Sequence, residues 1–343
     1  MILFLLSASA LAQQGYGVPS TDPYTDGYPS SSERELHLWT NAVRVDPEAF
    51  KDIYPCSYDS FTGTEKSPHD PLYLDMGLAE AGRYHSLDMQ ATGNFSHSSS
   101  DGTDFGTRVG WFYDSGNIGE NIAYGYGDPY NTIMIGWMCS SGHRANIMTD
   151  YTELGTGVAG DYYTQDFGGG AIDSSGPVAM GAHTPQSAGS TATLMADWLE
   201  LAAPARLDVI MDREVVPLSL TWGVETRGVY TAELALQPVD CHLYHFFWET
   251  VDGRSGNFPE QGSYTFGAGC TDGIGWVPER LDPDGLLGGL PGSGADQDGL
   301  GGGASDGRPL LSDPRLVGCS PVGGVAGLMG WMVGLLAVWR RRG

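Results

Sequence analysis

Residues 137–148 read WMCSSGHRANIM, and this stretch decides how the first half of the chain is interpreted. An apolar segment ends near Trp137, and Ser141 and Gly142 follow as a predicted helix cap and a turn residue. His143 then lies in the first turn of a short helix, where the positive end of the helix dipole disfavours a cation. We therefore expect His143 to be neutral near pH 7, with a lone pair available to a metal ion.

Three helices are predicted before this short one, because apolar residues recur at helical spacing behind cap residues. Ser32 and Glu35 have the spacing of a capping box at the start of the first helix. Gly93 ends the second helix, and Asp128 followed by Pro129 starts the third. The predicted helices cover approximately residues 33–45, 78–92 and 129–137.

Two strands are predicted after the short helix, at Glu153–Gly160 and Tyr162–Gly168, around a turn at Gly160 and Asp161. Helices followed by a hairpin indicate an α+β fold in which helices pack on a small sheet.

The second half of the chain has a different pattern. Short segments rich in β-branched and aromatic residues alternate with turn signals between residues 171 and 280, which predicts an antiparallel β-sandwich domain. Apolar side chains lie on both faces of the segment 242–248, so we expect that strand to be central.

Both ends of the chain differ from the predicted domains. The apolar start with its Ala10-Leu11-Ala12 pattern predicts a signal peptide, as opposed to a buried strand. Gly, Asp and Pro dominate residues 281–317, which predicts a flexible tether. Val322 to Trp339 is uncharged, long enough for a transmembrane helix, and followed by three arginines. The predicted segments are a signal peptide at 1–12, a flexible lead-in at 13–30, a tether at 281–317 and a tail at 318–343.

The tail resembles the MYXO-CTERM sorting tail of myxobacterial surface proteins, because Gly318-Cys319-Ser320 precedes the apolar span and the arginines. That resemblance implies processing or lipidation near Cys319. The body would then be at the cell surface, in the outer envelope or in the medium, with the tail at first in the inner membrane. The alternative is a permanent C-terminal anchor.

Charge and cysteine content narrow the class of protein. The formal net charge is −25, which disfavours binding to the phosphate backbone of nucleic acids. Five cysteines in an exported chain indicate disulfides. With Cys319 in the tail, pairing within each half gives Cys56–Cys139 and Cys241–Cys270, although the sequence does not fix the connectivity.

Five motifs then occur in order within the first half of the chain. They are Asn41-Ala42-Val43-Arg44, Phe95-Ser96-His97, Gly119-Glu120-Asn121-Ile122-Ala123, Ser141-Gly142-His143-Arg144-Ala145-Asn146-Ile147 and Tyr163-Thr164-Gln165-Asp166-Phe167. Residues 31–170 thereby resemble the CAP (SCP-like, CRISP–antigen 5–PR-1) superfamily in its bacterial form. The resemblance implies an α-β-α sandwich with a cleft that carries two histidines and two acidic residues.

Carried over by motif, His97, Glu120 and His143 match the cleft residues of the superfamily. The second acid is missing, because no carboxylate follows Trp137 at the position that many eukaryotic members use. The three residues could hold zinc with an open position for water. The remaining motif residues are expected to support the fold by hydrogen bonding: Asn41, Arg44, Asn121, Arg144 and Asn146.

The sequence favours a cell-surface binding or interaction module over an enzyme. Its ligand could be a small apolar molecule, a polysaccharide or an envelope protein, and the membrane is contacted through the C-terminal helix at least transiently. A metal-dependent extracellular hydrolase acting on peptide or polysaccharide is the first alternative. However, the chain has neither the His-Glu-x-x-His helix of a metalloprotease nor the Gly-x-Ser-x-Gly turn of a serine hydrolase. A structural envelope protein is the second alternative.

Overall fold

The computed structural model describes residues 28–281, except 173, 175, 186–190, 236–239, 268, 269, 271–274 and 279. The predicted signal peptide and sorting tail, together with nearly all of the lead-in and the tether, lie outside the described residues. None of the helices within the described ranges is long and apolar enough to cross a membrane.

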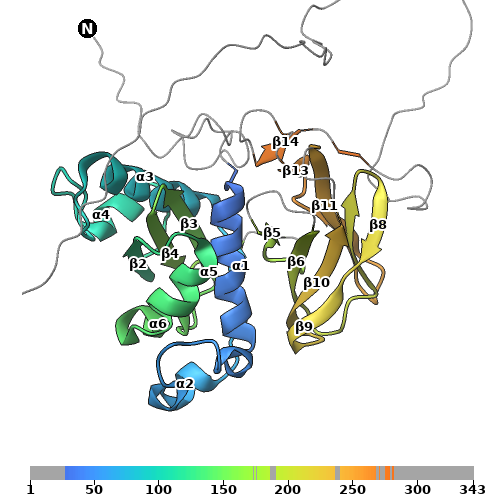
Figure 1. The fold of residues 1–343 in the computed structure, drawn as a ribbon, viewed down its shortest axis with the longest axis horizontal. Coiled ribbons are helices and arrows are strands. Elements are labelled where there is room, and N and C mark those ends of the chain that lie inside the picture. The colour runs from blue at the N-terminus through green and yellow to red at the C-terminus, as the bar shows by residue number, and fades with distance from the viewer. Residues whose placement is uncertain are drawn as a thin grey trace, which may run out of the picture. The chain divides into compact units, whose positions relative to one another are not determined.

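The first half is an α+β unit around a four-stranded sheet with the strand order β1-β3-β4-β2 (Figure 1). Strands β3 and β4 form the predicted hairpin, with β2 antiparallel to β4 and the short β1 parallel to β3. The elements are α1 (Ser31–Val45), η2 (Pro47–Phe50), η3 (Tyr58–Ser60), α2 (Gly63–Lys66), β1 (Tyr73–Leu74), α3 (Met76–Thr92), α4 (Phe105–Val109), β2 (Ile118–Tyr124), α5 (Pro129–Asn131), η4 (Thr132–Trp137), α6 (Ser141–Ile147), β3 (Glu153–Ala159) and β4 (Tyr162–Gly168).

Glycines set the distance between α3 and the sheet. A Cβ placed on Gly155 would lie 1.9 Å from the backbone nitrogen of Ala79, and one on Gly157 would lie 2.1 Å from the carbonyl carbon of Gly82. The helix backbone therefore rests directly on β3. This close approach brings the side chains of α3 onto the face of the sheet that also carries Asp166.

Two predicted helix caps are wrong. The first helix is capped by Ser30, whose side chain accepts from the backbone of Glu33, while Glu33 bonds back to the backbone of Ser30. Glu35 is not available for a capping box with Ser32, because it accepts from the indole of Trp39 at 3.1 Å. The short helix α6 has Ser140 as its N-cap, not Ser141, and makes no side-chain cap bond.

The third predicted helix has the expected limits but not the expected winding. Asp128 accepts from the backbone of Asn131 at 2.6 Å, as its cap role requires. Only three residues are α-helical, and Thr132 to Trp137 continue as a π-helix. Apolar periodicity cannot distinguish these windings, because both bury the same side of such a short segment.

The second half consists of antiparallel strands in two sheets, with the strand orders β5-β6-β10-β9 and β14-β13-β11-β7-β8, and with β12 paired to β11. One hydrophobic cluster draws side chains from both sheets, as the predicted sandwich requires. The expectation that residues 242–248 form a central strand is confirmed, because β11 pairs with β7, β12 and β13. The strands are β5 (Gly181–Thr184), β6 (Thr191–Leu199), β7 (Arg206–Met211), β8 (Glu214–Pro217), β9 (Ser219–Val224), β10 (Arg227–Ala235), β11 (His242–Glu249), β12 (Ser255–Phe258), β13 (Ser263–Phe266) and β14 (Trp276–Val277).

Helix α1 joins the two halves. It packs against β3 on one side and against β5, β6, β9 and β10 on the other, and Figure 1 shows it between the two groups of strands. Residues 33–45 of this helix are all buried, which is typical of a helix inside a core. At its centre the amide of Asn41 donates to the buried carboxylate of Asp197 at 2.5 Å, and also to the carbonyl of Leu72 at 3.0 Å.

The predicted disulfides are both present, so the pairing within each half is confirmed. Cys56–Cys139 ties the loop after η2 to the end of η4, with Cα atoms 5.5 Å apart. Cys241–Cys270 lies in the second half, with Cα atoms 4.5 Å apart.

Because the backbone of Gly82 occupies the space that a side chain at position 157 would need, we expect Gly157→Ala to lower the free energy of unfolding by about 2 kcal/mol or more. Gly63→Ala is the matched control, since nothing lies within 4 Å of its added Cβ, and its effect should stay within about 0.5 kcal/mol. Urea unfolding of both variants measures the difference. Equal stability of the two variants would show that α3 does not rest on β3 as described.

Candidate functional site

The site begins with Glu120, which lies on β2 at the edge of the four-stranded sheet. Glu120 is the direct partner of Asp166 on β4, and directly opposed residues project from the same face of a sheet. Asp166 points toward Gly82 of α3. The two carboxyl groups therefore lie together between the sheet and α3, where both side chains are buried.

Arg108 on α4 provides the positive charge for this buried pair. Its guanidinium forms an ion pair with Oε2 of Glu120, and neither side chain reaches solvent appreciably. The same guanidinium donates to the carbonyl of His97 at 3.0 Å and to the hydroxyl of Ser99 at 3.2 Å. Arg108 thus fixes both the carboxylate and the loop that carries His97.

His97 completes the arrangement from the solvent side. Its Nδ1 donates to Oε1 of Glu120 at 2.7 Å, while 56% of its side chain is exposed. The hydrogen bond that His97 donates to Glu120 raises the pKa of His97, and burial partly opposes this shift. Because the folded pKa exceeds the unfolded one, the stabilising effect is complete below the unfolded pKa and is lost as the pH rises through the folded pKa.

Asp166 differs from Glu120 in its charge state. Burial, followed by the negative charge of Glu120, raises the pKa of Asp166 well above its usual range. We therefore expect Asp166 to be neutral near pH 7, which leaves Arg108 to balance Glu120 alone.

His143 approaches from the other side of the sheet edge, on α6. Burial lowers the pKa of His143, and the nearby charge of His97 lowers it further. The expected neutral imidazole is therefore supported, but burial is the main cause, not the helix terminus that the sequence suggested. The imidazole ring also lies edge-on to Trp137, with ring centroids 6.5 Å apart.

Polar side chains close the free edge of β2. Asn146 donates to the carbonyl of Glu120 at 3.0 Å, and the indole of Trp137 donates to the carbonyl of Ile122 at 3.1 Å. Asn121 donates to the carbonyl of His143 at 3.1 Å. These bonds hold α6 and η4 against the strand and occupy acceptors that a further strand would need.

The other motif residues bond to partners outside the histidine site. Arg44 donates to the carbonyls of Asp70 and Thr149, each at 2.8 Å, which ties α1 to the segment after α6. Arg144 donates to the carbonyl of Met138 at 2.8 Å and lies 3.1 Å from the carboxylate of Glu65. With Asn41 bound to Asp197, these residues connect elements of the fold.

Two residues of the buried centre were not singled out from the sequence as site residues, namely Arg108 and Asp166. Asp166 lies inside one of the five motifs. Arg108 carried a weaker signal: together with Arg144 it is one of the only two lysine or arginine residues between positions 84 and 205. Both arginines are buried, and an isolated buried arginine in an acidic region needs a carboxylate partner.

Fewer side chains are available as metal ligands than the sequence predicted. Both oxygens of Glu120 are engaged, one by His97 and the other by Arg108. Within the described residues no group of three or more His, Cys, Asp or Glu side chains is arranged to hold a metal ion. The three residues therefore do not fit a three-ligand zinc site as they stand, and zinc remains a prediction that rests on two imidazoles.

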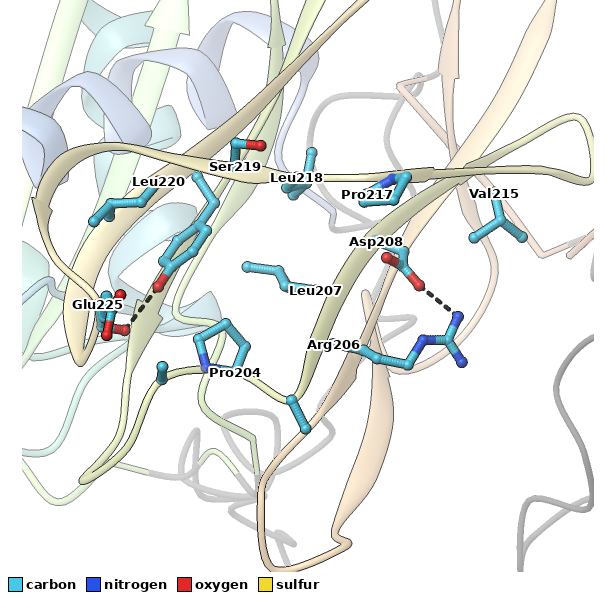
Figure 2. A pocket seen from close by; sticks show the side chains of 13 residues that line it. Pro204, Arg206, Leu207, Asp208, Val215, Pro217, Leu218, Ser219, Leu220 and Glu225 are labelled. Atoms are coloured by element: carbon cyan, nitrogen blue, oxygen red, sulfur yellow. Dashed lines mark hydrogen bonds and ion pairs between the residues drawn. The ribbon is translucent and has the colours of Figure 1, made fainter.

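Pockets are found in the second half of the chain, away from these histidines. One of about 630 Å³ is formed by β7, β8, β9 and β10, and Figure 2 shows the apolar side chains of Leu207, Leu218 and Leu220 within it. The ion pair of Arg206 and Asp208 lies at its side, with N and O atoms 2.5 Å apart. Another of about 550 Å³ surrounds the β11–β12 hairpin.

Known proteins resemble the first half of the chain. The family model for the cysteine-rich secretory protein family, CAP, matches residues 40–169. The resemblance to the CAP superfamily is therefore confirmed for this segment, which contains all the histidine-site residues. It covers less than half of the chain.

Among curated relatives, the uncharacterized membrane protein YlbC of Bacillus subtilis is 41% identical over 98 residues, and the uncharacterized protein YkwD of the same organism is 34% identical over 107 residues. These alignments cover 28% and 30% of this chain, and 28% and 41% of the relatives. Among solved structures, an extracellular protein containing an SCP domain from Bacillus anthracis is 36% identical, with 28% of this chain and 33% of that chain covered and a TM-score of 0.27.

Because Arg108 and His97 engage Glu120, the described residues of this site offer zinc the imidazoles of His97 and His143, and we expect zinc to bind there more weakly than at a three-ligand site. Calorimetric titration of the His97→Ala/His143→Ala variant should show that this binding is lost. The His69→Ala/His242→Ala variant is the control, since those histidines bond to Asp150 and Asp212 elsewhere. Zinc binding of equal strength in both double variants would place the metal away from this site.

Proposed function

We propose that this chain is an exported cell-surface protein whose CAP-like half is a binding or interaction module. The observation that carries the proposal is the engagement of Glu120 by Arg108 and His97. The site consequently presents two imidazoles of unlike pKa, one exposed and one half-buried, next to a carboxylate that is not free to act as a base. This arrangement suits recognition of a ligand better than hydrolysis of one.

Several observations support export. Two disulfides are present in the described chain, and disulfides persist in oxidising compartments. One relative is named a membrane protein, and one solved structure is described as extracellular. The predicted signal peptide and sorting tail point in the same direction, and the net charge of −25 keeps such a body soluble at a cell surface.

A metal-dependent hydrolase would need a ligand set and a general base that the described residues do not offer in this arrangement. Asp166 is buried, and its pKa is raised. We therefore expect its carboxyl group to be protonated and not to serve as a general base. A structural envelope protein needs no ligand at the histidines. A ligand that binds at His97 and His143 without being hydrolysed would therefore distinguish a binding module from both the hydrolase and the structural envelope protein.

The test is a thermal-shift measurement with fractions of the producing organism's envelope, separated into polysaccharide, lipid and protein. A ligand present at one hundred times its dissociation constant stabilises the folded state by about 2.7 kcal/mol. We expect at least one fraction to raise the melting temperature of the protein, and His97→Ala/His143→Ala to abolish the shift. His69→Ala/His242→Ala should retain it.

Two results would refute the proposal. In the first, no fraction changes the melting temperature, which favours the structural role. In the second, the shift persists in the His97→Ala/His143→Ala variant, which moves the binding site elsewhere on the chain.

A further inference from the structure

Three aromatic side chains form an exposed face beside the histidine site. Phe95 and Tyr124 are 50% and 56% exposed, and Tyr162 is partly exposed. The ring of Tyr124 lies between the other two, with its centroid 4.5 Å from that of Tyr162 and 6.4 Å from that of Phe95. Aromatic side chains contribute most when buried, so a contiguous exposed group of them indicates a binding surface.

The fold determines where this aromatic face lies. Tyr124 ends β2 and is the cross-strand partner of Tyr162 at the start of β4. Phe95 lies two residues before His97 in the loop that Arg108 fixes. The aromatic face of Phe95, Tyr124 and Tyr162 therefore continues from the exposed imidazole of His97 toward the end of the sheet.

Carboxylates lie in the loops next to the aromatic face, and the surrounding sequence has few cations. Between residues 84 and 205 the chain has no lysine, and its two arginines, Arg108 and Arg144, are 0% and 4% exposed. Asp128 and Asp161 are exposed in the loops next to Tyr124 and Tyr162. Their carboxylates lie near enough to help burial raise the pKa of Tyr163 to about 12. This surface repels anions and attracts cations.

The rings also have a geometry that suits a cation. Phe95 and Tyr124 are inclined at 48° to each other, so they form a wedge. A group at the open side of the wedge can lie within about 6 Å of both ring centroids, which is the range of cation–π attraction. A fully alkylated, quaternary ammonium has no N–H donors to satisfy, whereas a primary ammonium requires acceptors that the rings do not supply.

We propose that the aromatic face of Phe95, Tyr124 and Tyr162 binds an alkylated ammonium group carried by the ligand of this module. The assignment rests on the function proposed above and specifies the ligand's chemical class. The negative surroundings bring the cation to the wedge, the two rings hold it, and His97 contacts the adjoining part of the ligand.

The test is an NMR titration of the whole protein with choline, followed through aromatic resonances. Its neutral isostere, 3,3-dimethylbutan-1-ol, and the primary amine ethanolamine are titrated in parallel. We expect choline to bind most tightly, and its binding to weaken as sodium chloride screens the carboxylates. Phe95→Leu keeps the apolar bulk but removes the ring, so it should weaken choline binding about 2- to 5-fold and leave the alcohol unaffected.

Trp111→Leu is the matched control, because Trp111 is 48% exposed but its ring contacts Tyr84 and Phe112 elsewhere. That variant should bind choline as the unaltered protein does. Equal affinity for choline and the alcohol would make the face an apolar site, tighter binding of ethanolamine would contradict the alkylated class, and no binding or no effect of Phe95→Leu would overturn the location.

These outcomes differ from failure of the proposed function. If choline fails but an envelope fraction still raises the melting temperature through His97 and His143, only the ligand class is wrong. If neither experiment shows binding, both the ligand class and the proposed function are refuted.

Discussion

The ion pair between Arg108 and Glu120 forms where neither side chain reaches water, and the arrangement of the histidines follows from it. A buried charge without a partner costs about 3–5 kcal/mol, so each of these two residues requires the other. Once Arg108 holds one oxygen of Glu120, the second oxygen can orient His97 and raise its pKa. Burial, followed by the negative charge of Glu120, raises the pKa of Asp166 in the same buried centre, so we expect Asp166 to be neutral beside the pair. An exposed imidazole is thereby given a defined orientation by charges that lie inside the protein.

Buried polar contacts also connect the two halves of the chain. Asn41 in α1 donates to Asp197 of β6, whose other oxygen accepts from the backbone nitrogens of Ala179 and Met180. Burial raises the pKa of Asp197 to about 7, so ionisation of this carboxyl weakens the fold as the pH rises through its titration range. With α1 buried between two groups of strands, the strands of the second half complete the core around the CAP-like half.

Features with a local cause could be predicted from the sequence. The hairpin around Gly160 and the helix that ends at Gly93 follow from turn and cap chemistry, and the order of the cysteines favoured both disulfides without fixing their connectivity. The capping residue Ser30 was missed because three adjacent serines offer competing caps, and the deciding contacts come from residues far along the chain: Arg83 bonds to Glu33, and Thr184 bonds to Glu35. The role of Arg108 could not be predicted, because its partner Glu120 lies on β2 and the sequence around Arg108 does not identify that partner. Motif matching named the histidines, but it could not show that Glu120 was already engaged.

Buried Glu120 raises the pKa of His97, and NMR titration of the histidines measures this coupling. We expect His97 to titrate at a higher pH than His143, and Glu120→Gln to lower the pKa of His97, because an amide accepts the Nδ1 hydrogen bond without supplying a charge. Glu80→Gln, which removes a carboxylate that lies 3.6 Å from Arg83 instead, should leave that pKa unchanged. A His97 pKa below that of His143, or one that Glu120→Gln does not alter, would contradict the account.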